Sequence, residues 1–271
     1  MAAPEPASAE APPLSDTAVA VAAARAGADV VRRMAGASLS RVDKGGGDFA
    51  TDADIAAERA ILRVLRAHRP GDAVLGEEGG RQGAAESERQ WLVDPLCGTL
   101  NYAAGTGPAA VNVALRGGPA AVADPMDGDL YFTDGTGAWS HADGRDSRLS
   151  PTAESRLVDV NLDPPFPGAP RFSVLGMLGH PDFRALFRPR VVSTSLALAW
   201  VAAGKRAAYV TDGEDFASSV HFAAGIALCR AAGATVTALD GGPVGVGGLG
   251  LVAAADAEAH RLLLSIIGDR P

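Results

Sequence analysis

Residues 91–99 read Trp-Leu-Val-Asp-Pro-Leu-Cys-Gly-Thr, the most informative stretch of the chain. Three apolar residues lead into the carboxylate of Asp94, and the proline after it fixes the backbone. Gly98 and Thr99 then begin a helical turn, whose free backbone N–H groups can bind an anion. The order of strand, acidic turn and helix start is typical of a phosphate site. Taken alone, however, the stretch is better explained as an ordinary strand exit in which Asp94 caps a turn.

The composition describes a folded, acidic protein. Of the 271 residues, 47% are hydrophobic, which suits one large core or two closely joined subdomains. The formal net charge of −8 argues against nucleic acid or an anionic membrane as the main partner, since both are polyanions. For the same reason, a phosphorylated substrate would need a bound cation.

The cysteine content and the N-terminus indicate a cellular compartment. Cys97 and Cys229 are too few for a disulfide framework, and no uncharged apolar run is long enough to span a membrane. Residues 1–13 are rich in Ala and Pro, but they carry Glu5 and Glu10 and lack the basic start of a signal peptide. We therefore expect a cytoplasmic protein whose residues 1–13 form a disordered tail.

Helices and strands are expected to alternate along the chain. Apolar residues at helical spacing predict helices over residues 14–36, 52–68, 195–203, 222–232 and 256–267. Short apolar runs between Gly, Pro and acidic residues predict strands at residues 73–75, 91–93, 111–115, 120–123 and 249–254. Residues 163–171 contain five prolines or glycines and predict a loop between two halves of the chain.

Four blocks of acidic and small residues recur in one order across most of the chain. They are Lys44 to Asp54 (KGGGDFATDAD), Gly76-Glu77-Glu78, Trp91 to Tyr102 and His221 to Gly225 (HFAAG). This order resembles the inositol monophosphatase family, whose pattern runs K-x-x-x-D-F-V-T-x-x-D, G-E-E, W-x-V-D-P-[IL]-D-G-T-x-N-[FY] and W-D-x-A-A-G. The resemblance covers roughly residues 15–268.

The resemblance implies the family's α/β fold, a layered αβαβα sandwich. We expect one inositol-monophosphatase-like domain over residues 14–271, with an N-terminal α+β half to about residue 162 and an α/β half after it. The expected partner is a small phosphorylated substrate, such as a sugar or inositol phosphate. Members of the family usually form dimers, so a homodimer is an expectation that rests on the resemblance alone.

The resemblance also implies a magnesium site. In the family, Mg²⁺ ions held by oxygen ligands bind the substrate phosphate and activate water, a role suited to carboxylates. Carried over by position, Glu77, Asp94 and the Leu96 carbonyl would bind the first ion. Asp54 and Thr99 match the positions that orient the attacking water.

Three further residues match substrate-contacting positions of the family. The N–H groups of Gly98 and Thr99 would face phosphate oxygens. Lys44 matches a lysine beside the metal loop, and Glu214 lies near the acidic position that contacts the sugar.

The chain departs from the family at the second metal position. There the family has the carboxylates of D-P-x-D and W-D-x-A-A-G, and this chain has Cys97 and His221. One interpretation is loss of function, which leaves a binding or regulatory protein. A second is a rebuilt site, because Asp94, Cys97 and His221 form an O, S, N donor set that suits Zn²⁺ or another borderline metal better than Mg²⁺.

A third interpretation makes Cys97 a nucleophile, with its pKa lowered by the helix start and with His221 as its base. Single cysteines and histidines are often only structural, so each substitution alone says little. Asp54, Glu77 and Asp94 favour retained activity, because an inactive site has no need to keep clustered carboxylates that repel one another. The leading expectation is phosphate ester hydrolysis that is weak with Mg²⁺.

Overall fold

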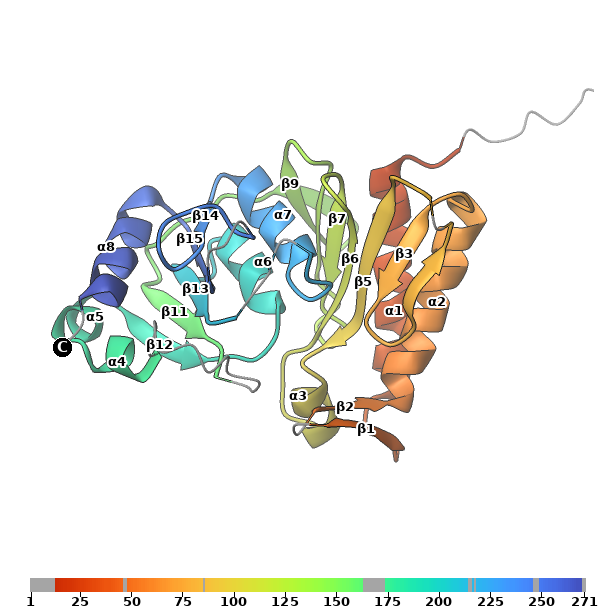
Figure 1. Ribbon diagram of the computed structural model, residues 1–271, viewed down its shortest axis with the longest axis horizontal. Helices are drawn as coiled ribbons and strands as arrows, with labels where there is room; N and C mark the ends of the chain where they lie inside the picture. Colours follow the sequence, from red (N-terminus) through yellow and green to blue (C-terminus); the bar gives the residue numbers. More distant parts are fainter. Residues whose placement is uncertain are drawn as a thin grey trace, which may run out of the picture.

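A computed structural model describes residues 13–45, 48–84, 86–162, 174–213, 216, 218–245 and 249–269. The expected disordered tail, except for Pro13, lies outside these residues, as do the expected loop at 163–171 and Glu214. Within them, helices and sheets alternate in five layers, so the expected αβαβα sandwich is confirmed (Figure 1). None of the helices in the described ranges is long and apolar enough to cross a membrane.

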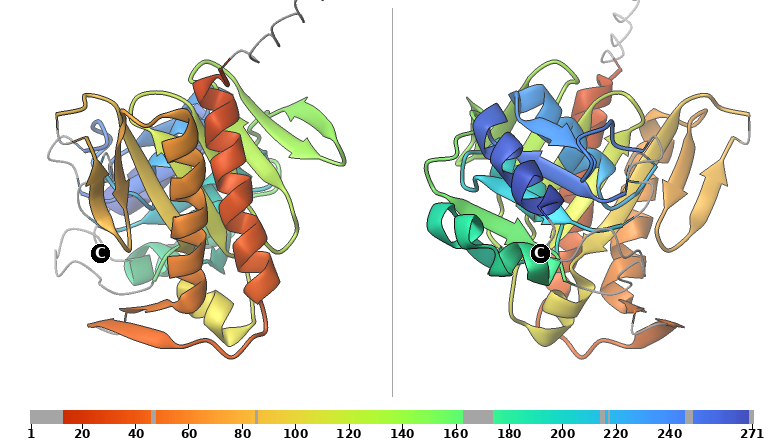
Figure 2. Two further views of the ribbon diagram at one scale, coloured as in Figure 1. Left: turned by 90° about the vertical axis from the view of Figure 1, so that its right-hand side faces the viewer. Right: turned by 60° about the vertical axis from the view of Figure 1, so that its left-hand side comes forward.

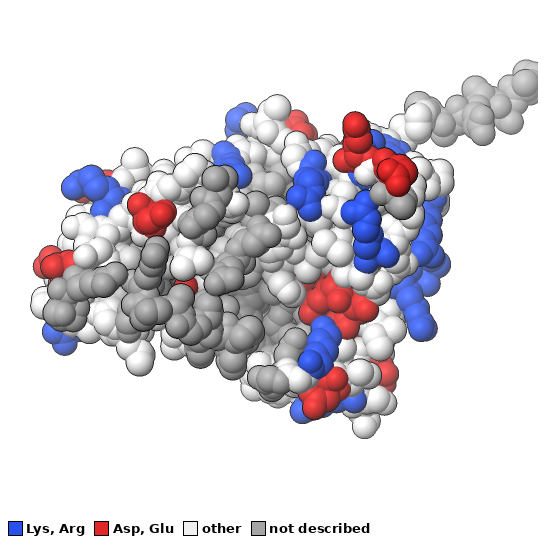
Figure 3. Space-filling view, viewed as in Figure 1, with Lys and Arg blue, Asp and Glu red and all other residues white. Residues whose placement is uncertain are grey.

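The first layer consists of α1 (Asp16–Met34) and α2 (Asp52–His68), which lie side by side over one face of a sheet (Figure 2). Both helices begin at a side-chain cap, Ser15 for α1 and Thr51 for α2. Their apolar stripes pack on the sheet, and their outer faces carry charged residues. Lys and Arg side chains gather along this edge of the molecule (Figure 3). Arg59, Arg63 and Arg66 of α2 are exposed.

The second layer is an eight-stranded sheet with the order β10-β9-β8-β7-β6-β5-β3-β4. Its strands are β3 (Ala73–Gly76), β4 (Gly80–Gly83), β5 (Gln90–Cys97), β6 (Ala110–Leu115), β7 (Ala120–Ala123), β8 (Leu130–Thr133), β9 (Ala138–Ala142) and β10 (Arg145–Arg148). All neighbours are antiparallel except β3 and β5. A separate ribbon of β1 (Arg41–Gly45) and β2 (Asp48–Thr51) precedes α2.

The third layer contains α6 (Leu196–Ala202) and α7 (Ala223–Ala232), packed between the two sheets. The second sheet has the order β12-β11-β13-β15-β14, with strands β11 (Leu157–Val160), β12 (Arg188–Val191), β13 (Ala208–Thr211), β14 (Thr235–Thr237) and β15 (Leu251–Ala254). The last layer is α4 (Val174–Gly179), α5 (Pro181–Leu186) and α8 (Ala257–Gly268). Because β11 already belongs to the second sheet, the change of sheet precedes the expected division near residue 162.

Candidate active site

A bulge in β5 brings several of the expected site residues to one point. Asp94 lies opposite Asn112 of β6 and Cys97 lies opposite Ala110, so three steps along β5 face two along β6. Such a bulge bends the strand and redirects its side chains. Asp94 is fully buried, and its Oδ1 accepts the Leu96 N–H at 3.0 Å. The strand therefore runs four residues beyond the expected 91–93 and includes the whole acidic turn.

Glu77 reaches the same point from the neighbouring strand. Its N–H donates to the Val93 carbonyl at 3.0 Å, which continues the parallel pairing of β3 with β5. Lys44 Nζ donates to Glu77 Oε1 at 2.9 Å and to Glu78 Oε1 at 2.6 Å. The other oxygen, Glu77 Oε2, is buried and has no hydrogen-bond partner among the described residues. An unpartnered buried carboxylate oxygen is costly, and a bound cation would remove that cost.

Glu58 of α2 holds the turn that carries Glu77. Its carboxylate is only 4% exposed and accepts the N–H groups of Glu78 at 2.9 Å and of Gly79 at 2.8 Å. A Cβ atom at Gly76 would lie 2.6 Å from Glu58 Oε2, so the turn closes tightly around this carboxylate. Glu58 is not among the site residues expected from the sequence, although its position one helical turn after Asp54 was a usable signal.

Asp54 and Thr99 are in contact. The Thr99 hydroxyl lies 3.0 Å from Asp54 Oδ1 and 2.9 Å from the Leu96 carbonyl oxygen, so it can donate to either. Asp54 also caps α2, where its Oδ2 accepts the Thr51 N–H at 2.8 Å and the Thr51 hydroxyl at 2.5 Å. Burial raises the pKa of Asp54 above its ordinary value, although these hydrogen bonds oppose the shift.

Gly98 links β5 to α3 (Thr99–Ala104). Its φ of 99° lies in the left-handed region that glycine favours, and a Cβ atom there would lie 3.0 Å from the Pro108 carbonyl oxygen. Gly98 is therefore the residue that the turn between strand and helix requires.

His221, two residues before α7, completes the cluster. Its Nδ1 lies 2.7 Å from Asp94 Oδ2 and 4.0 Å from Glu77 Oε2. Cys97 Sγ accepts the N–H of Ser195 at 3.1 Å. One ligand atom each from Asp94, Cys97 and His221 lies within 4.8 Å of the others, so small adjustments would let the three bind one ion.

The charges of this cluster depend on one another. Burial, and next the charge of Asp94, raise the pKa of Glu77 to about 8. Burial would lower the pKa of His221, but the charge of Asp94 and the hydrogen bond to it raise that pKa well above its ordinary value. Burial would raise the pKa of Asp94, but His221 holds it below its usual range. Without a metal ion, a proton on His221 balances part of the carboxylate charge.

The expectation of a low pKa for Cys97 is wrong. Cys97 is the last residue of β5 and not a helical residue, and Gly98 separates it from α3. Burial, and next the charge of Asp94, raise the pKa of its thiol. These effects outweigh the hydrogen bond and the charge of His221 and the hydrogen bond from Ser195, all of which lower that pKa, so the structure argues against Cys97 as a ready nucleophile.

Asp94 lies between two possible sets of metal ligands. The first side consists of Glu77 and Leu96, and the second side consists of Cys97 and His221. Glu77 Oε2, Asp94 and the Leu96 carbonyl offer only oxygen, which fits Mg²⁺. Asp94, Cys97 and His221 offer oxygen, sulfur and nitrogen, which fit Zn²⁺ better. Of the sequence-predicted residues, Lys44, Asp54, Thr99 and Gly98 lie around these two donor sets, and Glu214 lies outside the described ranges.

The chain resembles known proteins over most of its length. The model of the inositol monophosphatase family matches residues 14–270. The chain is 36% identical over 239 residues to the inositol-1-monophosphatase ImpA of Mycolicibacterium smegmatis, covering 84% of this chain and 83% of the relative. It is 35% identical over 206 residues to an inositol-1-monophosphatase of Caulobacter vibrioides, covering 73% and 78%.

A solved structure supports the fold. The extragenic suppressor protein suhB from Bartonella henselae superposes with a TM-score of 0.82 at 26% sequence identity. The match covers 94% of this chain and 98% of that protein. This chain and the Bartonella henselae protein therefore share the layered fold.

Proposed function

Since the chain belongs to the inositol monophosphatase family, we propose that it hydrolyses small phosphate monoesters of the inositol or sugar phosphate class. The observation that carries this proposal is the buried Oε2 of Glu77, which has no hydrogen bond among the described residues. It lies 4.0 Å from the same His221 Nδ1 that is 2.7 Å from Asp94 Oδ2. Two close carboxylates in a buried place repel each other unless a cation or a proton lies between them. Relatives whose names are inositol-1-monophosphatase support the substrate class.

Glu77, Asp94 and the Leu96 carbonyl would hold Mg²⁺. When bound, the ion supplies positive charge to the phosphate and acidifies a coordinated water. Lys44 keeps the Glu77 carboxylate oriented through its 2.9 Å hydrogen bond and balances the charge of Glu78. Because the chain carries a net charge of −8, these local positive charges are what would let a phosphate approach.

Thr99 and Asp54 would remove the proton from the attacking water. The Thr99 hydroxyl, 3.0 Å from Asp54 Oδ1, can accept a proton from water while it passes its own proton to Asp54. The raised pKa of Asp54 suits a carboxylate that must take up this proton. The water oxygen then forms the new bond to phosphorus, the bond between phosphorus and the ester oxygen breaks, and the leaving oxygen takes a proton from solvent to give the alcohol.

The second metal position is proposed as rebuilt for Zn²⁺ or another borderline metal. The gathering of Asp94, Cys97 and His221 ligand atoms within 4.8 Å supports this proposal. The alternative is a position without metal, in which protonated His221 remains hydrogen-bonded to Asp94 at 2.7 Å. In both cases the second Mg²⁺ of the family lacks two of its carboxylates, so activity with Mg²⁺ alone should be weak.

The test is phosphate release from a panel of inositol, sugar and nucleotide-derived phosphates with Mg²⁺, Mn²⁺ or Zn²⁺. We expect turnover of an inositol or sugar phosphate that falls at least about 100-fold in Asp94→Asn, since a metal contributes several kcal/mol to such reactions. Asp127→Asn changes an exposed carboxyl and serves as the control. Absence of metal-dependent release from every ester would refute the proposal and favour a binding or regulatory protein.

A further inference from the structure

The start of α6 lies against Cys97, one of the two residues on the second side of Asp94. The N–H of Ser195 donates to Cys97 Sγ at 3.1 Å. The hydroxyl of Thr194 donates to the Cys97 carbonyl oxygen at 3.0 Å. Both the side chain and the backbone of Cys97 are therefore held by residues of the second half of the chain, 97 and 98 positions away.

No helical hydrogen bond uses the N–H of Ser195. Thr194 caps α6, because its Oγ1 accepts the N–H of Leu196 at 3.3 Å and its carbonyl accepts the N–H of Ala197 at 3.3 Å. Ser195 then has the backbone angles of a first helical residue, with φ −66° and ψ −10°. The first N–H groups of a helix have no partner inside the helix. The one at Ser195 is directed to the sulfur of Cys97 instead.

Asn112 ties Ser195 to the sheet that carries Asp94. Its Nδ2 donates to Ser195 Oγ at 2.8 Å, and the pairing of β5 with β6 places Asn112 opposite Asp94. Asn112, Thr194 and Ser195 are at most 3% exposed. A buried polar network of this kind holds its members in one arrangement. The N–H of Ser195 is therefore fixed relative to the strand that carries both Asp94 and Cys97.

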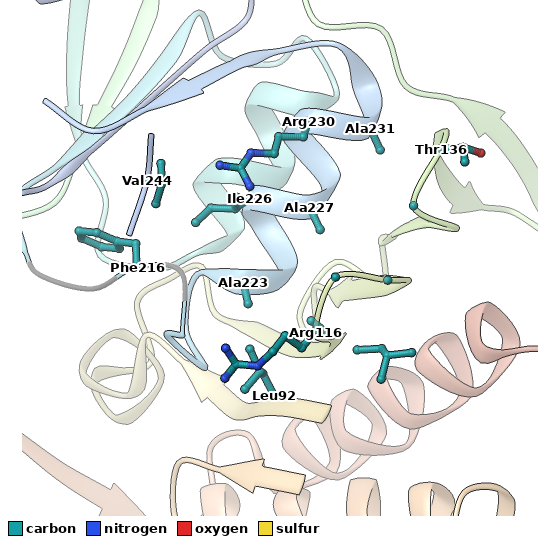
Figure 4. Close-up of a pocket in the computed structure, with 15 residues that line it drawn as sticks. Leu92, Arg116, Thr136, Phe216, Ala223, Ile226, Ala227, Arg230, Ala231 and Val244 are labelled. Atoms are coloured by element: carbon teal, nitrogen blue, oxygen red, sulfur yellow. The ribbon is translucent and has the colours of Figure 1, made fainter. Parts of the chain in front are cut away.

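This contact lies in a closely packed part of the molecule. Cys97 packs against the apolar cluster between the two sheets, to which Leu196 and Ala197 belong. A cavity of about 390 Å³ lies between α7 and the first sheet (Figure 4), but none of Cys97, Thr194 and Ser195 lines it. The sulfur of Cys97 therefore has little room to turn away from the N–H.

A hydrogen bond to sulfur is stronger when the sulfur is charged. A thiol is a weak acceptor, whereas a thiolate accepts a charge-assisted hydrogen bond. Because a cysteine must be deprotonated to bind a metal, a donor already directed at its sulfur stabilises the metal-bound state more than the metal-free state. Groups that support metal ligands in this way typically contribute about 10- to 100-fold to metal affinity.

We propose that Ser195 is a positioning residue of the second metal position, where its backbone N–H stabilises Cys97 as a thiolate ligand of Zn²⁺ or another borderline metal. Ser195 contributes no ligand atom and acts only through Cys97. This role rests on the proposed metal position of Asp94, Cys97 and His221, but it does not require that the protein hydrolyse phosphate esters.

Ser195→Pro removes the N–H while it suits the local backbone. Proline has a φ near that of Ser195, −66°, and is favoured as the first residue of a helix. Ser195→Ala is the matched variant, because it also loses the hydroxyl but keeps the N–H. Co²⁺ is titrated into the metal-free, full-length protein, and the charge-transfer absorption of a Co²⁺–thiolate bond reports binding.

We expect the Kd of Co²⁺ to be at least about tenfold higher in Ser195→Pro than in Ser195→Ala. Ser195→Ala should stay within about threefold of the unmodified protein, because the backbone donor remains. Cys97→Ser should abolish the charge-transfer band. Ala257→Pro places a proline at the exposed first residue of α8 and should leave the Kd unchanged.

The outcomes separate this role from the metal position itself. A charge-transfer band with equal Co²⁺ affinity in Ser195→Pro and Ser195→Ala would overturn the role of Ser195 and leave the metal position intact. No band in the unmodified protein would refute the metal position, and the role of Ser195 with it. Neither result bears on phosphate release, which is measured separately.

A second measurement needs no change at Ser195 and covers the case in which Ser195→Pro does not fold. Cd²⁺, which also binds thiolates, is added to ¹⁵N-labelled protein. The amide proton of Ser195 should move downfield in the unmodified protein and stay in place in Cys97→Ser. An amide proton that Cd²⁺ leaves in place, or moves equally in both proteins, would overturn the proposal.

Discussion

The two sides of Asp94 differ in whether their groups already have partners. On one side, Glu77 Oε2 is buried without a hydrogen bond among the described residues. On the other, His221 is hydrogen-bonded to Asp94 at 2.7 Å and Cys97 accepts the Ser195 N–H at 3.1 Å. A buried carboxylate oxygen without a hydrogen bond needs a proton or a cation, while a hydrogen-bonded group can do without either. The first side is therefore the stronger candidate for a metal, and the second can exist with or without it.

The largest change in the rate of phosphate release is expected when carboxylates are restored on the second side of Asp94. Cys97→Asp with His221→Asp should raise Mg²⁺-dependent phosphate release at least about 100-fold, because a second ion contributes several kcal/mol. The measurement is initial rate against Mg²⁺ concentration on the best substrate. Each single variant is the control, and we expect each to give less than the pair. A pair no faster than the unmodified protein would show that the second side is not what limits the reaction.

Metal content separates a rebuilt second side from an empty one. If the position binds Zn²⁺, then Cys97→Ser and His221→Ala should each remove about one equivalent of zinc from the purified protein. Elemental analysis after dialysis gives the stoichiometry. Cys229→Ala is the matched control, because Cys229 is buried away from the cluster beside the Leu198 carbonyl. Unchanged zinc in both ligand variants would exclude the rebuilt site.

A smaller effect is expected from a change at Glu58, whose carboxylate holds the turn that carries Glu77. Glu58→Gln keeps the shape but turns an amide N–H₂ toward one of the two backbone donors, so the turn carrying Glu77 should loosen. We expect the Mg²⁺ concentration for half-maximal rate to rise about tenfold, as for other groups that orient metal ligands.

The kinetic pattern distinguishes positioning from general destabilisation. In Glu58→Gln, the rate at saturating Mg²⁺ should recover most of its value. A purely structural role would lower the melting temperature and the rate together, without moving the half-saturation. Arg59→Ala, the exposed neighbour on α2, should change neither quantity.

The smallest expected effect is on the pH dependence of folding stability in the metal-free protein. The pKa of Glu77 rises from 4.5 to about 8 on folding, so the folded protein keeps a proton that the unfolded chain releases. Stability must then fall as pH rises from about 4.5 to 8. Glu77→Gln removes this dependence, so its melting temperature in EDTA should exceed that of the unmodified protein at pH 9 by a few degrees but not at pH 4.

The control for this prediction is Glu88→Gln, which changes an exposed glutamate. It should follow the unmodified protein at every pH. A melting temperature of Glu77→Gln below that of the unmodified protein at pH 9 would mean that the ion pair with Lys44 outweighs the cost of burying the charge.

The sequence predicts those parts of the fold that depend on neighbouring residues. The helix expected at 52–68 coincides with α2, because its apolar spacing is regular and Thr51 and Asp54 form a capping box at its start. This helix is encoded within about twenty residues of chain. The αβαβα sandwich was expected only through the family resemblance, which the four blocks between residues 44 and 225 carry together.

Features that depend on distant residues could not be predicted in this way. The pKa of Cys97 is set by burial and by Asp94, and its N–H partner, Ser195, lies 98 positions away. The helix start visible in the sequence predicted a lowered pKa of Cys97, whereas its pKa is raised. The bulge at Asp94 is equally invisible in the sequence, because it arises from how β5 pairs with β6.

The placement of the two ligand sets along the chain bears on the order in which they form during folding. Glu77 directly follows β3, and Asp94 and Leu96 lie in the adjacent strand β5, whereas the contact between Asp94 and His221 joins residues 127 positions apart. Closing a longer loop costs more entropy, and contacts between distant positions form late. On a ribosome, the proposed magnesium ligands would emerge and pair well before His221 is synthesised. A nascent chain could therefore acquire its first ion before its second half exists.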